Sequence, residues 1–219
     1  MKNQQRKSCF TLVEVLIAMG ICVVGVVSIM GLFPVGANTA RDANMAFYAD
    51  QAADQMLHFT KFAVLEDSSS TNAVFLALTG FGSNINSSSG YTAQSKPGGA
   101  AEPADWSTVD SVADNAAFSG LTEQYVKMLA NSGTEIKAHG TSVYRVGFFT
   151  HGDDDDYEDF ACVVRMWATP VFVDEMAATP SHAIPRAATF HLEVSWPAEL
   201  PYARRQTAEY AFDVFVPEG

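Results

Sequence analysis

Basic residues are scarce in this chain, which carries 13 lysines and arginines against 25 aspartates and glutamates in 219 residues. A protein that binds DNA or RNA by general electrostatics needs clustered positive charge to neutralise phosphates. Beyond residue 9, Arg204-Arg205 is the only adjacent basic pair, and we expect it on the solvated surface. General nucleic-acid binding is therefore not expected.

Cysteine is almost absent, with single residues at positions 9, 22 and 162. Cys9 and Cys22 both fall within the first 22 residues, so Cys162 is the only cysteine in the rest of the chain. That part of the chain therefore has no internal disulfide. Cys162 lies in an apolar run, which favours a small core residue over a reactive thiol.

Motifs for catalysis and for cofactor binding are also missing. The sequence has no G-x-S-x-G, no glycine-rich phosphate loop and no paired-cysteine motif, and its five histidines lack the H-E-x-x-H spacing. We expect neither an enzyme nor a bound cofactor.

One acidic run is a weak candidate for a cation site. Four consecutive carboxylates offer the oxygen ligands that Ca²⁺ prefers. They lack the spacing of an EF-hand loop, and consecutive carboxylates cannot all point at one ion, so a solvated turn is the preferred interpretation. The residues are Asp153, Asp154, Asp155 and Asp156.

A long apolar run dominates the N-terminal part of the chain. From Phe10 to Gly36 the only charged residue is Glu14. A helix of this length measures about 40 Å, enough to cross a hydrocarbon core of about 30 Å. A carboxylate inside such a span is costly unless it finds a partner. We therefore expect a membrane helix over residues 10–36 in which Glu14 has a purpose beyond anchoring.

The residues before the apolar run predict its orientation. Residues 1–9 are polar and carry Lys2, Arg6 and Lys7. Positive charge before a span favours a cytoplasmic N-terminus. Everything after Gly36 is then expected outside the inner membrane.

The run Phe10-Thr11-Leu12-Val13-Glu14, after a short basic leader, resembles the processing signal of type IV pilins and type II secretion pseudopilins. The resemblance covers about the first 55 residues and its motif is specific. One position departs from the family pattern, since Cys9 stands where the family usually has glycine.

This resemblance implies a structural subunit, most simply a minor pilin or pseudopilin. Residues 1–9 would be a leader that a prepilin peptidase removes at the Cys9–Phe10 bond, with N-methylation of Phe10. Glu14 would then pair with the Phe10 amine of a neighbouring subunit during filament assembly. The implied partners are other subunits, the peptidase, the inner-membrane assembly platform and the lipid bilayer, and the implied location is the inner membrane and then a periplasmic or cell-surface filament.

Other interpretations of the N-terminal run stay open. A secretory signal peptide cut near Val35-Gly36-Ala37 would need a shorter apolar core. A plain membrane anchor, as in a tethered adhesin or receptor that never polymerises, leaves Glu14 without a purpose. A secreted or anchored enzyme with an unrecognised site is a third alternative. A lipoprotein signal fails because no apolar stretch precedes Cys9.

The helix is expected to continue as an amphipathic segment over residues 37–65. The predicted apolar stripe is Ala43, Ala46, Phe47, Ala53, Met56, Leu57 and Phe62, largely at three- and four-residue spacings. Pro34 removes one helical hydrogen bond near the outer end of the membrane run, so it predicts a kink.

The remaining residues, 66–219, are expected to form one exported domain. Residues 80–108 are rich in serine, glycine, asparagine and proline, which predicts a variable loop region, and residues 121–130 predict a short helix. Residues 142–216 predict an antiparallel sheet: a hairpin over 142–150 and 160–168 with a turn at 152–158, and alternating strands over 189–196 and 208–216. The predicted fold is α+β, a long N-terminal helix packed on a sheet of about four strands.

Overall fold

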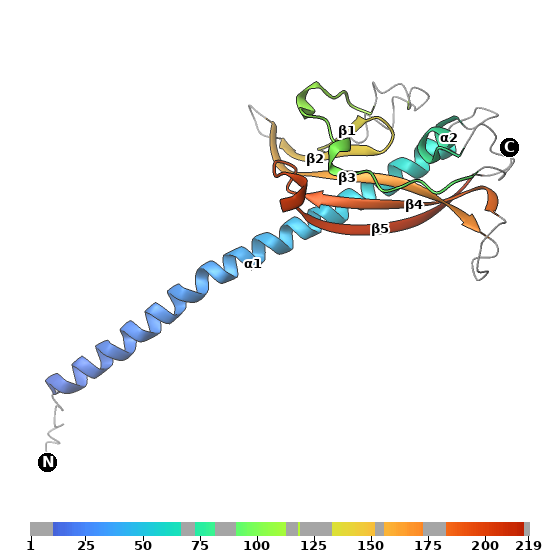
Figure 1. The fold of residues 1–219 in the computed structure, drawn as a ribbon. Coiled ribbons are helices and arrows are strands. Elements are labelled where there is room, and N and C mark those ends of the chain that lie inside the picture. The colour runs from blue at the N-terminus through green and yellow to red at the C-terminus, as the bar shows by residue number, and fades with distance from the viewer. Residues whose placement is uncertain are drawn as a thin grey trace, which may run out of the picture. The chain divides into compact units, whose positions relative to one another are not determined.

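The structure, a computed structural model, describes residues 11–66, 73–81, 91–112, 118, 133–151, 156–172 and 183–216. The chain divides into two compact units, residues 1–46 and 47–219. The first unit contributes only helix to the described residues, and the second holds the sheet (Figure 1).

Helix α1 extends from Leu12 to Glu66 and passes through Pro34 without interruption. The single helix expected over residues 10–65 is therefore present. Residues 11–44 are exposed throughout. In the second unit, α1 buries side chains at three- and four-residue spacings, the pattern of one helix face packed on a core. They are Ala49, Ala52, Ala53, Met56, Phe59, Thr60, Ala63 and Val64.

The predicted apolar stripe was wrong at its beginning. Phe47 is 66% exposed, and Ala43 and Ala46 are exposed as well. The buried face begins at Ala49 instead, six residues after the predicted start at Ala43. Helical spacing alone does not say where along the helix the sheet begins to cover it.

The sheet has five antiparallel strands in the order β1-β2-β3-β4-β5, so each strand pairs with its neighbours in sequence. This confirms the predicted α+β fold and the hairpin, with one strand more than the four expected. The strands are β1 (Thr134–His139), β2 (Val143–His151), β3 (Asp156–Phe172), β4 (Ala183–Trp196) and β5 (Gln206–Phe215).

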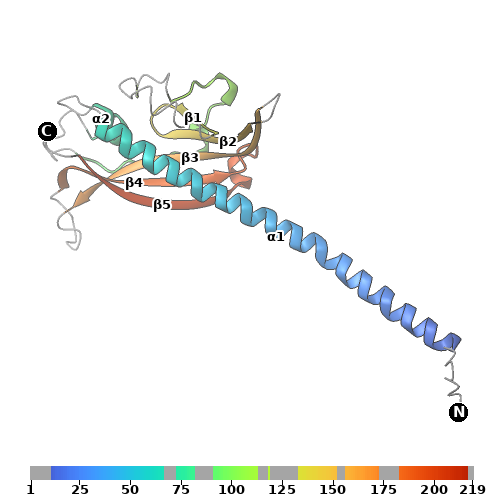
Figure 2. The same ribbon diagram turned by 180° about the vertical axis from the view of Figure 1, so that it is seen from behind.

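One face of the sheet packs against the second-unit part of α1. Tyr48 stacks on Phe160 of β3 with ring centroids 5.4 Å apart, and the Thr60 hydroxyl lies 3.5 Å from the sulfur of Met166. The two opposite views show α1 crossing this face (Figures 1 and 2). The opposite face is covered by residues 91–110, which we call the strap segment (Figure 1).

The strap segment falls in the predicted loop region and is irregular apart from two short 3₁₀ helices, η1 (Gly99–Ala101) and η2 (Trp106–Thr108). It is tied to the sheet. Gln94 N–H donates to the carbonyl of Ala168, and the N–H of Ala168 donates to Gln94 Oε1, both at 2.9 Å. Gln94 also donates to Leu78 O of helix α2 (Ala73–Thr79), which the sequence analysis did not anticipate.

Strand β4 is buried on both faces, which the alternation of its residues did not predict. Phe190, Leu192 and Val194 are buried as expected, yet Glu193 and Ser195 from the supposedly solvated face are only 2% and 0% exposed. The reason is the strap segment, since it covers the face on which these polar residues lie. Strand β5 is half-exposed as predicted, with Val214 buried.

Candidate functional site

Glu14 lies in the first turn of α1 and makes a capping box with Thr11. The main-chain N–H and the hydroxyl of Thr11 donate to Glu14 Oε2 at 3.0 and 3.1 Å. The N–H of Glu14 in turn donates to the Thr11 hydroxyl oxygen at 3.3 Å. This exchange satisfies main-chain donors that a helix start leaves unpaired. Glu14 therefore has a local structural role, readable from Thr-x-x-Glu, that the sequence analysis missed.

The segment after Glu14 meets the length and composition of a membrane span. Its side chains from Leu12 to Val35 are exposed and mainly apolar. Ser28, a hydroxyl residue within the run, donates to Val24 O at 2.7 Å, so its polar group is satisfied inside the helix. The single candidate span found in the described residues fits a single-pass membrane protein.

The remaining residues predicted for this region divide between described and undescribed parts. Cys9 and Phe10, the predicted cleavage and methylation positions, lie outside the described residues. Pro34 lies inside α1, and Thr39 donates to Val35 O at 2.9 Å one turn later. The predicted kink at Pro34 stays a prediction.

The acidic run is only partly described. Asp153, Asp154 and Asp155 lie outside the described residues, and Asp156 is the first residue of β3. The predicted turn therefore ends earlier than expected, because residues 156–158 pair with β2. Within the described ranges, no cluster of three or more histidine, cysteine or acidic residues is arranged to hold a metal ion. The predicted short helix at 121–130 also lies outside them.

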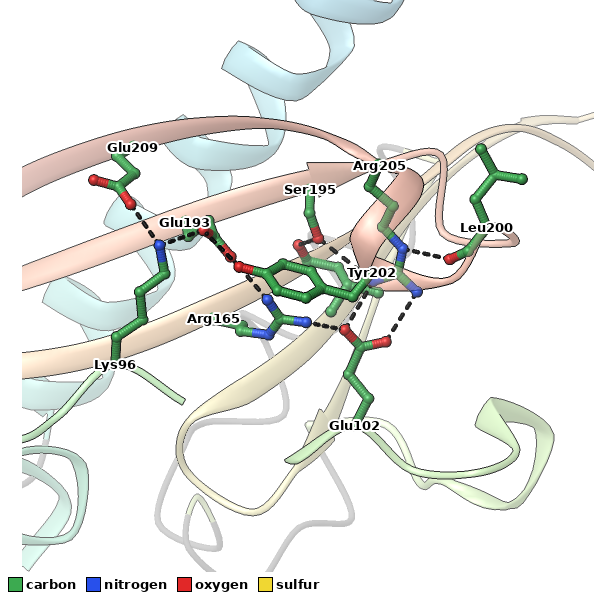
Figure 3. Close-up of polar contacts among 10 residues, drawn as sticks. Lys96, Glu102, Arg165, Glu193, Ser195, Leu200, Tyr202, Arg205 and Glu209 are labelled. Atoms are coloured by element: carbon green, nitrogen blue, oxygen red, sulfur yellow. Dashed lines mark hydrogen bonds and ion pairs between the residues drawn. The ribbon is translucent and has the colours of Figure 1, made fainter. Parts of the chain in front are cut away.

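A dense polar cluster in the described residues is an ion-pair network under the strap segment (Figure 3). Its six charged side chains alternate in sign along one connected series. They are Glu209 of β5, Lys96 and Glu102 of the strap segment, Glu193 of β4, Arg165 of β3, and Arg205 from the turn before β5.

Arg165 occupies the centre of this network. Its side chain has no solvent exposure, and its Nη1 donates to Glu193 Oε1 at 2.8 Å. Its Nη2 donates to Glu102. The ring of Tyr202 covers the guanidinium, with Cζ 3.5 Å from the ring centroid, and the Tyr202 hydroxyl donates to Glu193 Oε2 at 3.2 Å. A buried arginine is tolerated because two carboxylates and an aromatic face replace water around its two terminal nitrogens, while its Nε has no hydrogen-bond partner among the described residues.

Arg205 fastens the strap segment to the turn before β5. Its Nη1 and Nη2 donate to the two oxygens of Glu102 at 2.8 and 2.9 Å, a bidentate pair. The same guanidinium donates to the carbonyls of Leu200 and Ala198 at 2.7 and 3.0 Å. The expectation of a solvated Arg204-Arg205 pair was therefore wrong for Arg205, whose side chain is 5% exposed. It holds for Arg204, which is exposed.

Lys96 and Glu209 form the solvent-exposed end of the network. The Lys96 ammonium contacts Glu193 and lies 2.5 Å from Glu209 Oε1. Hydrogen bonds from these two carboxylates, Glu193 first, raise the pKa of the Lys96 ammonium above its ordinary value, because they favour its charged form. The ammonium also lies 5.6 Å from the ring centroid of Trp167.

The arrangement holds chain segments together and offers no nucleophile paired with a base. Three cations and three carboxylates balance, and each carboxylate accepts from at least one of the cations. The hydroxyl of Ser195 donates to Val163 O at 3.0 Å, so its proton is already bound. The network thus fixes the strap segment on the sheet across β3, β4 and β5.

The sequence pattern did not predict this network, although it contained one signal. Arg165 interrupts the apolar run from Phe160 to Ala168. A charged residue in such a run needs partners, as was argued for Glu14. The partners themselves come from positions 28 and 63 residues away, and sequence spacing does not reveal them.

Cys162 behaves as the sequence predicts. It is fully buried on β3, and its sulfur lies 3.8 Å from Val146 O. Burial raises the pKa of its thiol, so the reactive thiolate is disfavoured. The interpretation as a core residue is confirmed.

The geometry leaves two features to explain: an exposed apolar helix that begins with a capped glutamate, and a sheet face closed by an ion-pair network. Comparison with protein-family models, with curated proteins and with solved structures finds no match to this chain.

Proposed function

We propose that this chain is a structural subunit of a type IV pilus-like or type II secretion pseudopilus filament. The observation that carries the proposal is the contrast within α1. Residues 11–44 are exposed, are mainly apolar from Leu12 to Val35, and follow directly on Phe10 in the motif Phe10-Thr11-Leu12-Val13-Glu14. An apolar helix of this length needs lipid or other helices around it, and a filament core built from copies of the same helix supplies the second.

Glu14 is the residue that separates assembly from simple anchoring. In the free chain its Oε2 accepts from Thr11. The proposed cut before Phe10 creates an amino group four residues from Glu14, at about the same membrane depth. In a bundle of staggered parallel helices, the carboxylate of one subunit then neutralises the amine of the next. A subunit shifted along the axis leaves both charges unmatched in an apolar core, so the pair also sets the register.

Substitutions at Glu14 and Thr11 separate the charge from the helix cap. Glu14→Leu removes both roles, while Glu14→Gln keeps a side chain that suits the third helical position of a capping box but removes the charge. Thr11→Val removes the capping hydroxyl and keeps the carboxylate. We expect both Glu14 variants to insert in the membrane and to be largely lost from sheared filaments. Thr11→Val should retain most of its incorporation.

The measurement compares membrane and sheared-filament fractions of cells that carry the assembly machinery. Filament incorporation of Glu14→Leu at the wild-type level would contradict the assembly role. It would favour the tethered adhesin or receptor that does not polymerise. If Glu14→Gln assembles normally and Thr11→Val does not, then Glu14 acts through the helix cap alone.

Processing gives a second, independent test. The proposal makes the chain a substrate of a prepilin peptidase, with a mature N-terminus at methylated Phe10. Intact mass and N-terminal sequencing of membrane-derived protein measure this directly. A mature chain that starts at or near Asn38 would instead identify a secretory signal peptide.

A further inference from the structure

A pocket of about 390 Å³ lies between the strap segment and the turn before β2. It forms where β2 stops pairing with β3. The last paired residues are Val143 and Arg165, and beyond them β3 continues to Phe172. Along this part of β3 the strap segment, and not β2, forms hydrogen bonds with the strand. The pocket is the space between the strap segment and the turn before β2.

The walls of the pocket are held in place by hydrogen bonds of main-chain groups and of the Gln94 side chain. On one side, the N–H of Met166 donates to Ser142 O at 2.8 Å. On the other, Gln94 exchanges two hydrogen bonds with Ala168 and donates a third to Leu78 O. The neighbouring Lys96 is fixed by the ion-pair network. A site with fixed walls loses little conformational entropy when a ligand binds.

The chemistry of the lining is neutral. Four hydroxyl side chains line the pocket, and none has a hydrogen-bond partner within the described ranges; they are Thr92, Ser95, Thr141 and Ser142. A hydroxyl both donates and accepts. Trp167 and Pro97 add apolar surface, and no charged side chain belongs to the lining. Two further pockets in the described residues differ, because Lys137, Arg145, Asp105 and Glu199 line one and Asp110 and His139 line the second.

We propose that this pocket binds a neutral carbohydrate. A sugar ring carries several hydroxyls that donate and accept, together with apolar C–H faces, and the four free hydroxyls and the apolar patch match both. The volume lies in the range of small-ligand sites. A charged ligand would enter a site that has no counter-charge in its lining, in a chain that is acidic overall. The proposal is independent of filament assembly.

The test uses the full-length chain in a zwitterionic detergent, because a detergent with a sugar headgroup would compete for the pocket. The labelled protein is applied to a printed array of neutral, sialylated and sulfated glycans. The best neutral glycan is then titrated by calorimetry. We expect binding to neutral glycans, weakened about tenfold in Thr141→Val/Ser142→Ala, because that variant loses two hydrogen bonds.

Thr207→Val is the matched control, since Thr207 is an exposed hydroxyl on β5 outside the pocket lining. It should bind as the wild type does. If the double variant fails to fold by circular dichroism, Ser95→Ala tests the opposite wall, which the strap segment forms, with an expected loss of about threefold. Four results would overturn the proposal: no glycan binding, a preference for charged glycans, binding of neutral peptides in place of glycans, or unchanged affinity in the folded pocket variants.

Discussion

The membrane-length part of α1 and strand β3 each contain one charged residue in an apolar run, and the chain satisfies the two charges in different ways. Arg165 of β3 is buried between Glu193 and Glu102 under the ring of Tyr202. Glu14 is exposed, and within the described residues its carboxylate accepts hydrogen bonds only from Thr11, its own helix cap. The second unit therefore supplies the partners of its buried charge from distant parts of the chain, whereas Glu14 has no ion-pair partner among the residues that the structure describes.

The same contrast holds for apolar surface along α1. Phe59 and Met56 are fully buried, and Phe59 packs edge-on against Phe118 with centroids 5.1 Å apart. Val23 and Ile29 on the same helix are 59% and 69% exposed. One helix thus carries two kinds of surface. The first stabilises the fold of this chain, and the second becomes buried only in lipid or among other helices.

The largest expected effect comes from Arg165→Met. It leaves Glu193 and Glu102 with fewer partners in a buried site, and breaking a buried ion pair typically costs about 3–5 kcal/mol. Arg204→Met makes the same chemical change at an exposed position of the turn before β5 and should cost about 0.5 kcal/mol or less. Urea unfolding of the full chain in detergent measures both. Similar losses in the two variants would mean that the network does not stabilise the domain.

Phe59→Ala should destabilise the globular unit by about 3–5 kcal/mol, because it removes a buried aromatic side chain and leaves a cavity. Val23→Ala shortens an exposed side chain in the first unit. The unfolding midpoint of the second unit should then stay within experimental error of the wild-type value. The comparison uses near-ultraviolet circular dichroism, which follows the aromatic core. A clear loss in Val23→Ala would show that the two kinds of surface on α1 are not independent.

Lys96→Met removes the most exposed cation of the network. Lys96 is 37% exposed, so we expect a loss of about 1 kcal/mol or less. The folded state raises the pKa of its ammonium above the ordinary 10.5. A group with a raised folded pKa contributes its full stabilisation below the ordinary value and loses it as the pH rises through the folded value.

The difference in free energy of unfolding between wild type and Lys96→Met should therefore be the same at pH 6 and at pH 9. It should shrink only above about 10.5, the ordinary value of lysine. Denaturant titrations at four pH values from 6 to 11 measure it. A difference that disappears between pH 6 and 9 would assign the stabilisation to a group other than Lys96.

Periodicity and composition predicted the elements whose signal is local. The amphipathic helix, the hairpin of β2 and β3, and the alternating strands β4 and β5 were all expected from residues close in sequence. Strand β1 was missed because Thr134–His139 is short and alternates charged with small or aliphatic residues. Its position depends on pairing with β2 and on the bridge between Ser111 and Lys137.

The strap segment and its network could not be predicted for a related reason. Composition indicated a loop, and the segment is irregular, but its attachment depends on pairs such as Arg205–Glu102 that are 103 residues apart. Alternation placed Glu193 on a solvated face because it cannot reveal that an irregular segment covers that face. In contrast, the capping box of Glu14 was readable from three-residue spacing.

The smallest expected effect comes from Phe47→Ala, and it tests where the buried part of α1 begins. The sequence pattern placed Phe47 in the buried stripe, but its side chain is 66% exposed and contacts Tyr48 only edge-on, at 6.1 Å between centroids. Because little apolar area is lost, the free energy of unfolding should fall by about 0.5 kcal/mol or less. Phe59→Ala makes the same chemical change twelve positions later on the same helix and is the matched control. Urea unfolding of both variants under identical conditions gives the two losses in free energy of unfolding and therefore their ratio. A loss in Phe47→Ala that approaches that of Phe59→Ala would move the start of the buried helix face back from Ala49 to Phe47, as the sequence pattern predicted for this residue.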